Sequence, residues 1–234
     1  MKNRFLRPFL SLVAAGTAVT LFAEGDDSGW TSLFDGSSTD AWRGYQMDHF
    51  PEEGWKVEDG VLATVPGTAR TDIVTVESFQ NFELYLEWRV AERGNSGIFY
   101  QVSEDGSAIW HSAPEFQILD DEAHGLAEDH LHSTGSVYDL IAPESPKPLE
   151  PAGEFNTSRV IVRDRRVEHW VNDEKVVDYD LDSDEFREKV AESKFAQFAD
   201  FGRVRSGPIG LQHHGNEVAF RNIKIRRLDS ATDQ

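Results

Sequence analysis

Short segments of alternating apolar and polar residues dominate the chain. In residues 82–90 (FELYLEWRV), Leu84, Leu86, Trp88 and Val90 alternate with more polar neighbours. A period of two is expected of a β-strand that buries one face. We therefore predict a strand here, and similar patterns predict strands at 98–102, 115–119, 159–163, 167–171 and 220–227.

Turn-forming residues separate these segments, and helical signals are few. Gly94-Asn95-Ser96-Gly97 is predicted to form a tight turn. Asp182 is expected to cap one short helix, with Glu185 at the capping-box position and Phe186 and Val190 on one side. The pattern predicts an all-β fold, a two-sheet antiparallel β-sandwich or jelly roll with one short helix.

The N-terminal residues have the pattern of an export signal. Lys2, Arg4 and Arg7 precede an apolar stretch of about 14 residues at 9–22, which is short for a membrane anchor. We predict a signal peptide at 1–23, a single sandwich domain at 24–228 and a flexible tail at 229–234. The protein would then be periplasmic or secreted; the alternative is an uncleaved anchor.

Composition and charge narrow the choice of partner. The sequence has no cysteine, so an exported fold must depend on its hydrophobic core rather than on disulfides. Loss of the three basic residues of the signal changes the net charge from −19 to −22. Such a surface repels nucleic acid and anionic lipid. We expect a neutral partner such as a sugar, with no nucleic acid and no membrane after signal cleavage.

A series of short phrases, in order along residues 29–228, carries a resemblance to a known family. They are GWTSLFDG at 29–36, WKVEDGVL at 55–62, LEWR at 86–89, GNSGI at 94–98, PEFQILD at 114–120, YD at 138–139, GEFN at 153–156, EHWVN at 168–172, GLQHHG at 210–215 and FRNIKI at 220–225. Together they make the chain similar to the 3-keto-disaccharide hydrolase domain family, long described as a domain of unknown function.

The resemblance implies a concanavalin-like jelly roll, bacterial export and action on glycosides whose glucose ring carries a 3-ketone. Two positions depart from the family pattern. His213 stands where the family often has an acidic residue, so the family histidine matches His214. Phe155 stands where the family often has tryptophan.

A 3-keto sugar changes the chemistry of glycoside cleavage. The ketone makes the C2 proton acidic and places the glycosidic oxygen β to the carbonyl. One base can then remove the C2 proton and expel the aglycone, and water can add to the resulting enone. Such a site needs a base, a donor or metal for the enolate oxygen, and an acid for the leaving group.

Strand phase selects the catalytic candidates. Glu115 and Gln117 lie on one face of a predicted strand, about 7 Å apart along it, while Phe116 points to the other face. His214 lies in phase with Gln212, and a histidine suits proton transfer at neutral pH. We predict Glu115, Gln117 and His214 as catalytic residues; the alternatives are a solvated strand face and a turn histidine.

Seven further residues are predicted to contact substrate. Trp110 is a candidate for stacking on a sugar ring, whereas His169 has a packed core histidine as its alternative, and Glu87 and Arg89 have a surface ion pair. The set comprises Glu87, Arg89, Tyr100, Trp110, Asp120, His169 and His213.

No certain cofactor follows from the sequence. Asp120, Asp121, Glu122 and His124 form an acidic loop, and hard cations prefer oxygen ligands, so a divalent ion is one hypothesis for this loop. A solvated acidic loop is the other.

The function predicted from the sequence is therefore an exported enzyme that cleaves 3-keto-glycosides. A non-catalytic carbohydrate-binding module is the first alternative, because folds of this class also serve lectins. A structural or adhesive envelope protein is the second.

Overall fold

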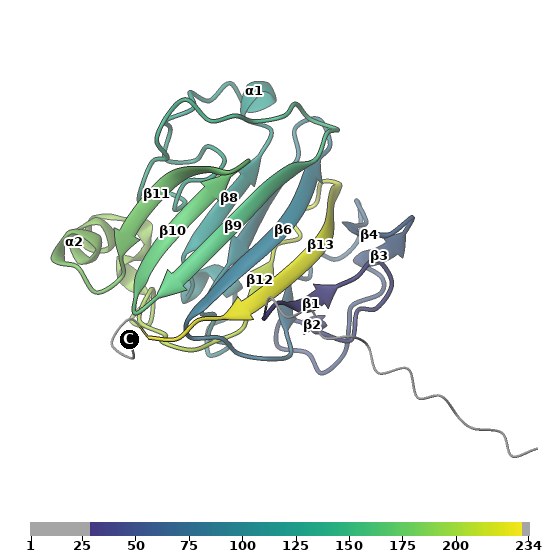
Figure 1. Cartoon of the computed structure of the whole chain (residues 1–234), viewed down its shortest axis with the longest axis horizontal. Coiled ribbons are helices and arrows are strands. Elements are labelled where there is room, and N and C mark those ends of the chain that lie inside the picture. The colour runs from purple at the N-terminus through teal and green to yellow at the C-terminus, as the bar shows by residue number, and fades with distance from the viewer. Residues whose placement is uncertain (1–28, 231–234) are drawn as a thin grey trace, which may run out of the picture.

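Two antiparallel β-sheets lie face to face in the computed structural model, which describes residues 29–230 (Figure 1). One sheet has eight strands and the other has five. The predicted two-sheet antiparallel sandwich is therefore confirmed. The predicted signal peptide at 1–23 and the last residues of the predicted tail, 231–234, lie outside the described residues.

The eight-stranded sheet follows the order β11-β10-β9-β6-β13-β4-β3, and β1 also pairs with β13. Its long central strands cross the front of the molecule in Figure 1. The strands are β1 (Thr31–Phe34), β3 (Trp55–Glu58), β4 (Val61–Thr64), β6 (Phe82–Val90), β9 (Asn156–Arg163), β10 (Arg166–Val171), β11 (Glu174–Asp180) and β13 (Val218–Arg227).

The five-stranded sheet follows the order β2-β5-β12-β7-β8, so β8 is an edge strand. Its strands are β2 (Trp42–Gly44), β5 (Ile73–Thr75), β7 (Asn95–Phe99), β8 (Glu115–Leu119) and β12 (Gly210–Leu211). The helices are α1 (Asp121–His124), α2 (Asp184–Glu192) and the 3-10 helices η1 (Ile109–His111) and η2 (Lys194–Gln197). No helix within residues 29–230 is long and apolar enough to cross a membrane.

Two local predictions differ from the structure. Asn95, Ser96 and Gly97 belong to strand β7 rather than to a tight turn, because the turn closes at Gly94. The Gly94 N–H donates to the Ala91 carbonyl at 2.8 Å. In α2, Ser183 rather than Asp182 is the N-cap: its hydroxyl accepts from the backbone N–H three residues on, at 3.1 Å. Small polar residues at both places are compatible with a turn, a helix cap or a strand, so residue identity alone did not determine the local structure.

The core fills the space between the sheets with one face of each strand. Alternate residues of β6 are buried, as the sequence predicts, and Leu86 and Trp88 are each 1% exposed. From the other sheet, Ile98, Phe116 and Ile118 enter the same core cluster. The opposite face of the five-stranded sheet is therefore free to carry polar side chains.

A buried hydrogen-bond chain crosses this core. The His169 Nδ1 lies 2.8 Å from the Gly135 carbonyl, so this nitrogen carries the proton and Nε2 accepts from the Tyr100 hydroxyl at 3.0 Å. The Tyr179 hydroxyl lies 2.7 Å from that of Tyr100 and donates to it. Burial lowers the pKa of His169 to about 4, so it stays neutral.

This placement corrects the prediction that Tyr100 and His169 contact substrate. Both are 0% exposed and bond to each other inside the sandwich. His169 lies in phase with Val167 and Val171, which face the core, and Tyr100 meets it there. The alternative of a packed, hydrogen-bonded histidine is the one that holds for His169.

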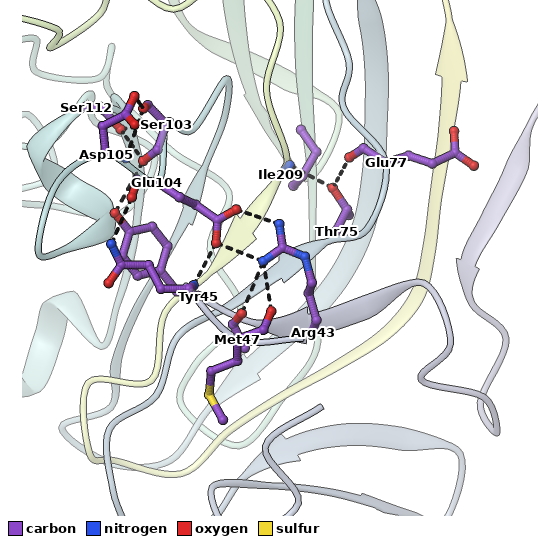
Figure 2. A network of polar contacts seen from close by, with 12 residues as sticks. Arg43, Tyr45, Met47, Thr75, Glu77, Ser103, Glu104, Asp105, Ser112 and Ile209 are labelled. Carbon is purple, nitrogen blue, oxygen red and sulfur yellow. Dashed lines mark hydrogen bonds and ion pairs between the residues drawn. The ribbon is translucent and has the colours of Figure 1, made fainter. Parts of the chain in front are cut away.

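A polar network fastens the loop before η1 to strand β2 (Figure 2). Two guanidinium nitrogens of Arg43 donate hydrogen bonds to the Glu104 carboxylate, and the Tyr45 hydroxyl donates to the Gly106 carbonyl at 2.7 Å. Within the loop, the Ser112 hydroxyl accepts from the Ser103 N–H at 2.9 Å. Bidentate Arg–carboxylate pairs restrict geometry strongly. The network thus fixes the loop that leads into η1, the 3-10 helix on which Trp110 lies.

The buried chain generates a stability prediction. Tyr100→Phe leaves His169 Nε2 and the Tyr179 hydroxyl without their partner, which is expected to lower the free energy of unfolding by about 1–3 kcal/mol. Tyr85→Phe is the matched control, because the Tyr85 hydroxyl is only partly buried and makes one 3.3 Å bond to Glu87; its effect should stay within about 0.5 kcal/mol. Urea unfolding measures both, and equal effects of the two substitutions would contradict the account.

Candidate active site

Four neighbouring positions form a row across the outer face of the five-stranded sheet: Asp72, Gln212, Gly97 and Gln117. Gly97 lies opposite Gln117 in the β7–β8 register, and the Gln212 N–H donates to the Gly97 carbonyl at 3.0 Å. Continuing the β5–β12 register by one residue places Asp72 beside Gln212. Since neighbouring strands lie about 4.8 Å apart, Gln212 and Gln117 flank Gly97 with Cα atoms about 10 Å apart.

Gly97 leaves a gap in this row, and the carboxyl group of Glu115 fills it. A Cβ placed on Gly97 would lie 2.7 Å from the Glu115 carboxyl carbon and closer still to its Oε1. Real Cβ atoms do not approach other atoms so closely, so any side chain here would displace the carboxyl group. Glycine at this position therefore allows Glu115 to lie back over the sheet.

A pocket of about 210 Å³ opens above this row. The three predicted catalytic residues, Glu115, Gln117 and His214, all line it, together with Trp110. These four predicted residues are brought together. The full lining is Asn95, Trp110, Glu115, Gln117, Tyr138, Lys194, Phe195, Gln212 and His214.

Glu115 is an acid in an unusual environment. It is 9% exposed, and within residues 29–230 its carboxyl oxygens have no hydrogen-bond or ion-pair partner. Burial raises the pKa of Glu115 to about 8; the Asp72 carboxylate raises it further, and the Lys194 ammonium opposes the shift. The carboxyl group of Glu115 is therefore mainly protonated at pH 7.

Asp72 is a second carboxyl group whose pKa is raised by burial. Burial raises the pKa of Asp72 to about 6, while the His213 N–H, which donates to Asp72 Oδ1 at 2.9 Å, opposes the shift. At pH 7 Asp72 is mainly ionised, and its negative charge favours the protonated form of Glu115.

His214 lies at the exposed rim of the pocket. Desolvation by its neighbours, followed by the positive charge of Arg70, lowers the pKa of His214. Its imidazole is thus neutral at pH 7 and can accept a proton. The pocket therefore contains a protonated acid, Glu115, and a neutral base, His214. Their environments raise the pKa of the acid and lower that of the base.

Three amide oxygens in the pocket have no hydrogen-bond partner. Gln117 is 2% exposed, and its Oε1 accepts no hydrogen bond. The same holds for Asn95 Oδ1 and Gln212 Oε1. Buried polar atoms of folded proteins are nearly always paired. Three unpaired acceptors in one pocket indicate a place where a ligand donates hydrogen bonds.

A larger hollow lacks such chemistry. It has a volume of about 510 Å³ and lies between α2 and the segment that follows η2, with Phe186 and Phe198 in its lining. Its Arg187 is bound to Asp184 and its Arg205 to Asp182. We place the active site in the smaller pocket because the perturbed acid, the histidine and the unpaired amides meet there.

The remaining predicted substrate contacts lie elsewhere. Glu87 and Arg89 are on the outer face of the eight-stranded sheet, where Glu87 is paired with Arg221 and Arg89 lies 5.2 Å from the Phe155 ring. Their phase opposite the core was predicted correctly, but this face belongs to the sheet that does not carry the pocket. His213 is 1% exposed and packs edge-on against Trp55, so it too is outside the pocket.

The acidic loop does not fit a cation site. Asp120 accepts from the N–H groups of Arg93 and Ala123 and so caps α1 rather than facing substrate. Asp121 accepts from Thr134 and from the buried ammonium of Lys147 at 2.8 Å. Among residues 29–230, no group of three or more His, Cys, Asp or Glu side chains is arranged to hold a metal.

Sequence reasoning missed several pocket residues. Gln212 was recognised only as the phase partner of His214, and Asn95 was assigned to a turn. Tyr138 belongs to one of the family phrases but carried no role. Lys194 and Phe195 come from η2, which lies far along the chain, and no local pattern points to them.

Comparison with known proteins shows the family of the chain. Residues 29–226 match the model of the 3-keto-alpha-glucoside-1,2-lyase-like domain family. A 3-keto-disaccharide hydrolase of Bacteroides thetaiotaomicron is 36% identical over 234 aligned positions, covering 87% of this chain and 80% of the relative.

Solved structures support the same assignment. The crystal structure of a proposed glycosyl hydrolase from Parabacteroides distasonis has a TM-score of 0.78 at 34% identity, covering 86% of this chain and 94% of that one. A carbohydrate-binding module from Bacillus subtilis has a TM-score of 0.51 at 11% identity, over 80% of this chain and 95% of that one, and shows only the shared fold. The chain belongs to the family of 3-keto-alpha-glucoside-1,2-lyase-like domains and is an enzyme of the hydrolase or lyase type.

Proposed function

We propose that this protein is an exported enzyme that cleaves 3-keto-glycosides by removal of the C2 proton and elimination of the aglycone. The observation that carries the proposal is the meeting of Glu115, Gln117 and His214 in one pocket. The hydrolase of Bacteroides thetaiotaomicron supports the substrate class. Export rests on the sequence of residues 1–23 alone.

His214 is the base of the proposed reaction. Its neutral imidazole takes the proton from C2, and the electrons of the C2–H bond form the C2–C3 double bond of an enolate, with negative charge on the C3 oxygen. A histidine with a lowered pKa is available for this at neutral pH.

Glu115 is the acid. When the enolate collapses, the C3 carbonyl forms again, a C1–C2 double bond forms and the bond between C1 and the glycosidic oxygen breaks. The leaving oxygen takes the proton of Glu115, which the raised pKa keeps in place up to about pH 8. Addition of water across C1 and C2 of the enone completes net hydrolysis.

The first prediction concerns substrate choice. Purified protein is expected to release aglycone from a 3-keto-disaccharide and not from the unoxidised sugar, because only the ketone acidifies the C2 proton. Glu115→Gln should lower kcat by about 10²–10⁴-fold while sugar binding persists. Chromatography of the products measures this; failure to turn over any member of a panel of 3-keto-glycosides would refute the proposed function.

The second prediction concerns the gap at Gly97. Gly97→Ala is expected to move the Glu115 carboxyl group and reduce kcat by about 10²-fold, since misplacement of a catalytic group by about 1 Å has effects of this size. Circular dichroism and urea unfolding control for loss of the fold. A folded Gly97→Ala protein with wild-type kcat would contradict the role of the gap.

A further inference from the structure

The pocket has two chemically different sides. Its floor, on the sheet, presents the unpaired amide oxygens of Asn95, Gln117 and Gln212. Its wall lies outside the sheet and includes Tyr138, which bears a hydroxyl group, and Lys194 of η2, which bears an ammonium group. The floor therefore has unpaired acceptors, and the wall adds a positively charged donor and a hydroxyl donor.

The ammonium group of Lys194 is held in position, but its hydrogen-bond donors are not used within the described residues. It lies 4.3 Å from the centre of the Tyr138 ring and 5.2 Å from that of Phe195. Its one ion pair, to Asp139 Oδ2, is long at 3.8 Å. Within the described part of the chain its three N–H donors have no hydrogen-bond acceptor. Cation–π contacts hold the charge in place while leaving these donors open.

Tyr138 is the second donor of the wall. Its ring stacks on His132 with centroids 4.6 Å apart, which fixes the ring. Burial, followed by the charges of Glu115 and Asp139, raises the pKa of Tyr138, so the hydroxyl keeps its proton. No acceptor for that proton lies within residues 29–230.

A single oxidised sugar ring matches this division. Ring hydroxyl groups both donate and accept hydrogen bonds and so suit the amide groups of the floor, whereas a ketone only accepts them and is matched by the ammonium and hydroxyl donors of the wall. The volume of about 210 Å³ is below the roughly 300–1,000 Å³ of pockets that enclose drug-sized ligands. One ring therefore occupies the pocket and the aglycone projects outside.

We infer that Lys194 is a further catalytic residue, which binds the C3 oxygen of one oxidised ring and stabilises the negative charge that develops there as the enolate forms. The inference rests on the proposed function. Lys194 is the one Lys or Arg among the described residues that line this pocket. A preorganised positive charge at a developing oxyanion is among the strongest contributions a protein makes to catalysis.

The experiment isolates enolate formation from cleavage. The probe is a 3-keto-1,5-anhydrohexitol, which has no aglycone to expel, so enzyme-catalysed exchange of its C2 proton in D₂O reports enolate formation without glycoside cleavage. Lys194→Met is expected to slow exchange by about 10²–10³-fold, with the dissociation constant of the probe changed less than about tenfold. Lys194→Arg should retain an intermediate rate. NMR measures the exchange.

Lys189→Met is the matched control, because Lys189 on α2 carries the same charge and pairs with Glu185 at 3.7 Å, away from this pocket. It should exchange the probe at the wild-type rate. Wild-type exchange in folded Lys194→Met protein, or equal losses in both variants, would overturn the inference.

A second readout separates catalysis from mere structure. Lys194 opposes the raised pKa of Glu115, so Lys194→Met should move the alkaline limb of the kcat profile to higher pH. An unmoved limb would contradict the placement of the ammonium. Failure of the wild-type protein to release aglycone from every 3-keto-glycoside would instead refute the proposed function itself, which is a distinguishable result.

Discussion

The proposed active site depends on the absence of one side chain. Gly97 sits in the middle of a row of polar residues on the five-stranded sheet, and the carboxyl group of Glu115 occupies the space that a Cβ would take. Burial there removes water from the carboxyl group without supplying a hydrogen-bond partner. The raised pKa of Glu115, on which its proposed role as an acid at neutral pH rests, follows from this one gap.

The rest of the sandwich serves to hold this arrangement. The large sheet and the buried chain through Tyr100 and His169 fix the inner face of the small sheet, so its outer face can carry unpaired polar atoms. Such atoms reduce stability and are tolerated where function requires them. The loop that leads into η1, which carries Trp110, is held by the pair of Arg43 and Glu104, and η2 brings Lys194 to the pocket.

Period and turn signals were enough to predict the fold class and the phase of most strands, because side chains alternate strictly along a strand. They placed Glu115 and Gln117 on the face opposite Phe116, as the structure has them. They did not say which sheet a face belongs to. Glu87 was therefore assigned to the site, although it lies on the other sheet.

The sequence patterns also could not predict which residues distant along the chain lie close together in the fold. Asp72 acts on Glu115 through space, and Lys194 reaches the pocket from a helix that no local pattern connects with it. The family resemblance supplied the substrate class and pointed to His214, but the gap at Gly97 becomes visible only once the strands are paired.

The protonation state of Glu115 tests the account most directly. ¹³C NMR of the glutamate side chains, with Glu115→Gln used to assign the signal, follows each carboxyl group through a pH titration. The account predicts one carboxyl group that titrates near pH 8, because its folded pKa is raised from the usual 4.5 to about 8. The folded protein then retains a proton that the unfolded chain has released, so this group lowers stability as pH rises through that range. Titration of Glu115 near pH 4.5 would contradict the account.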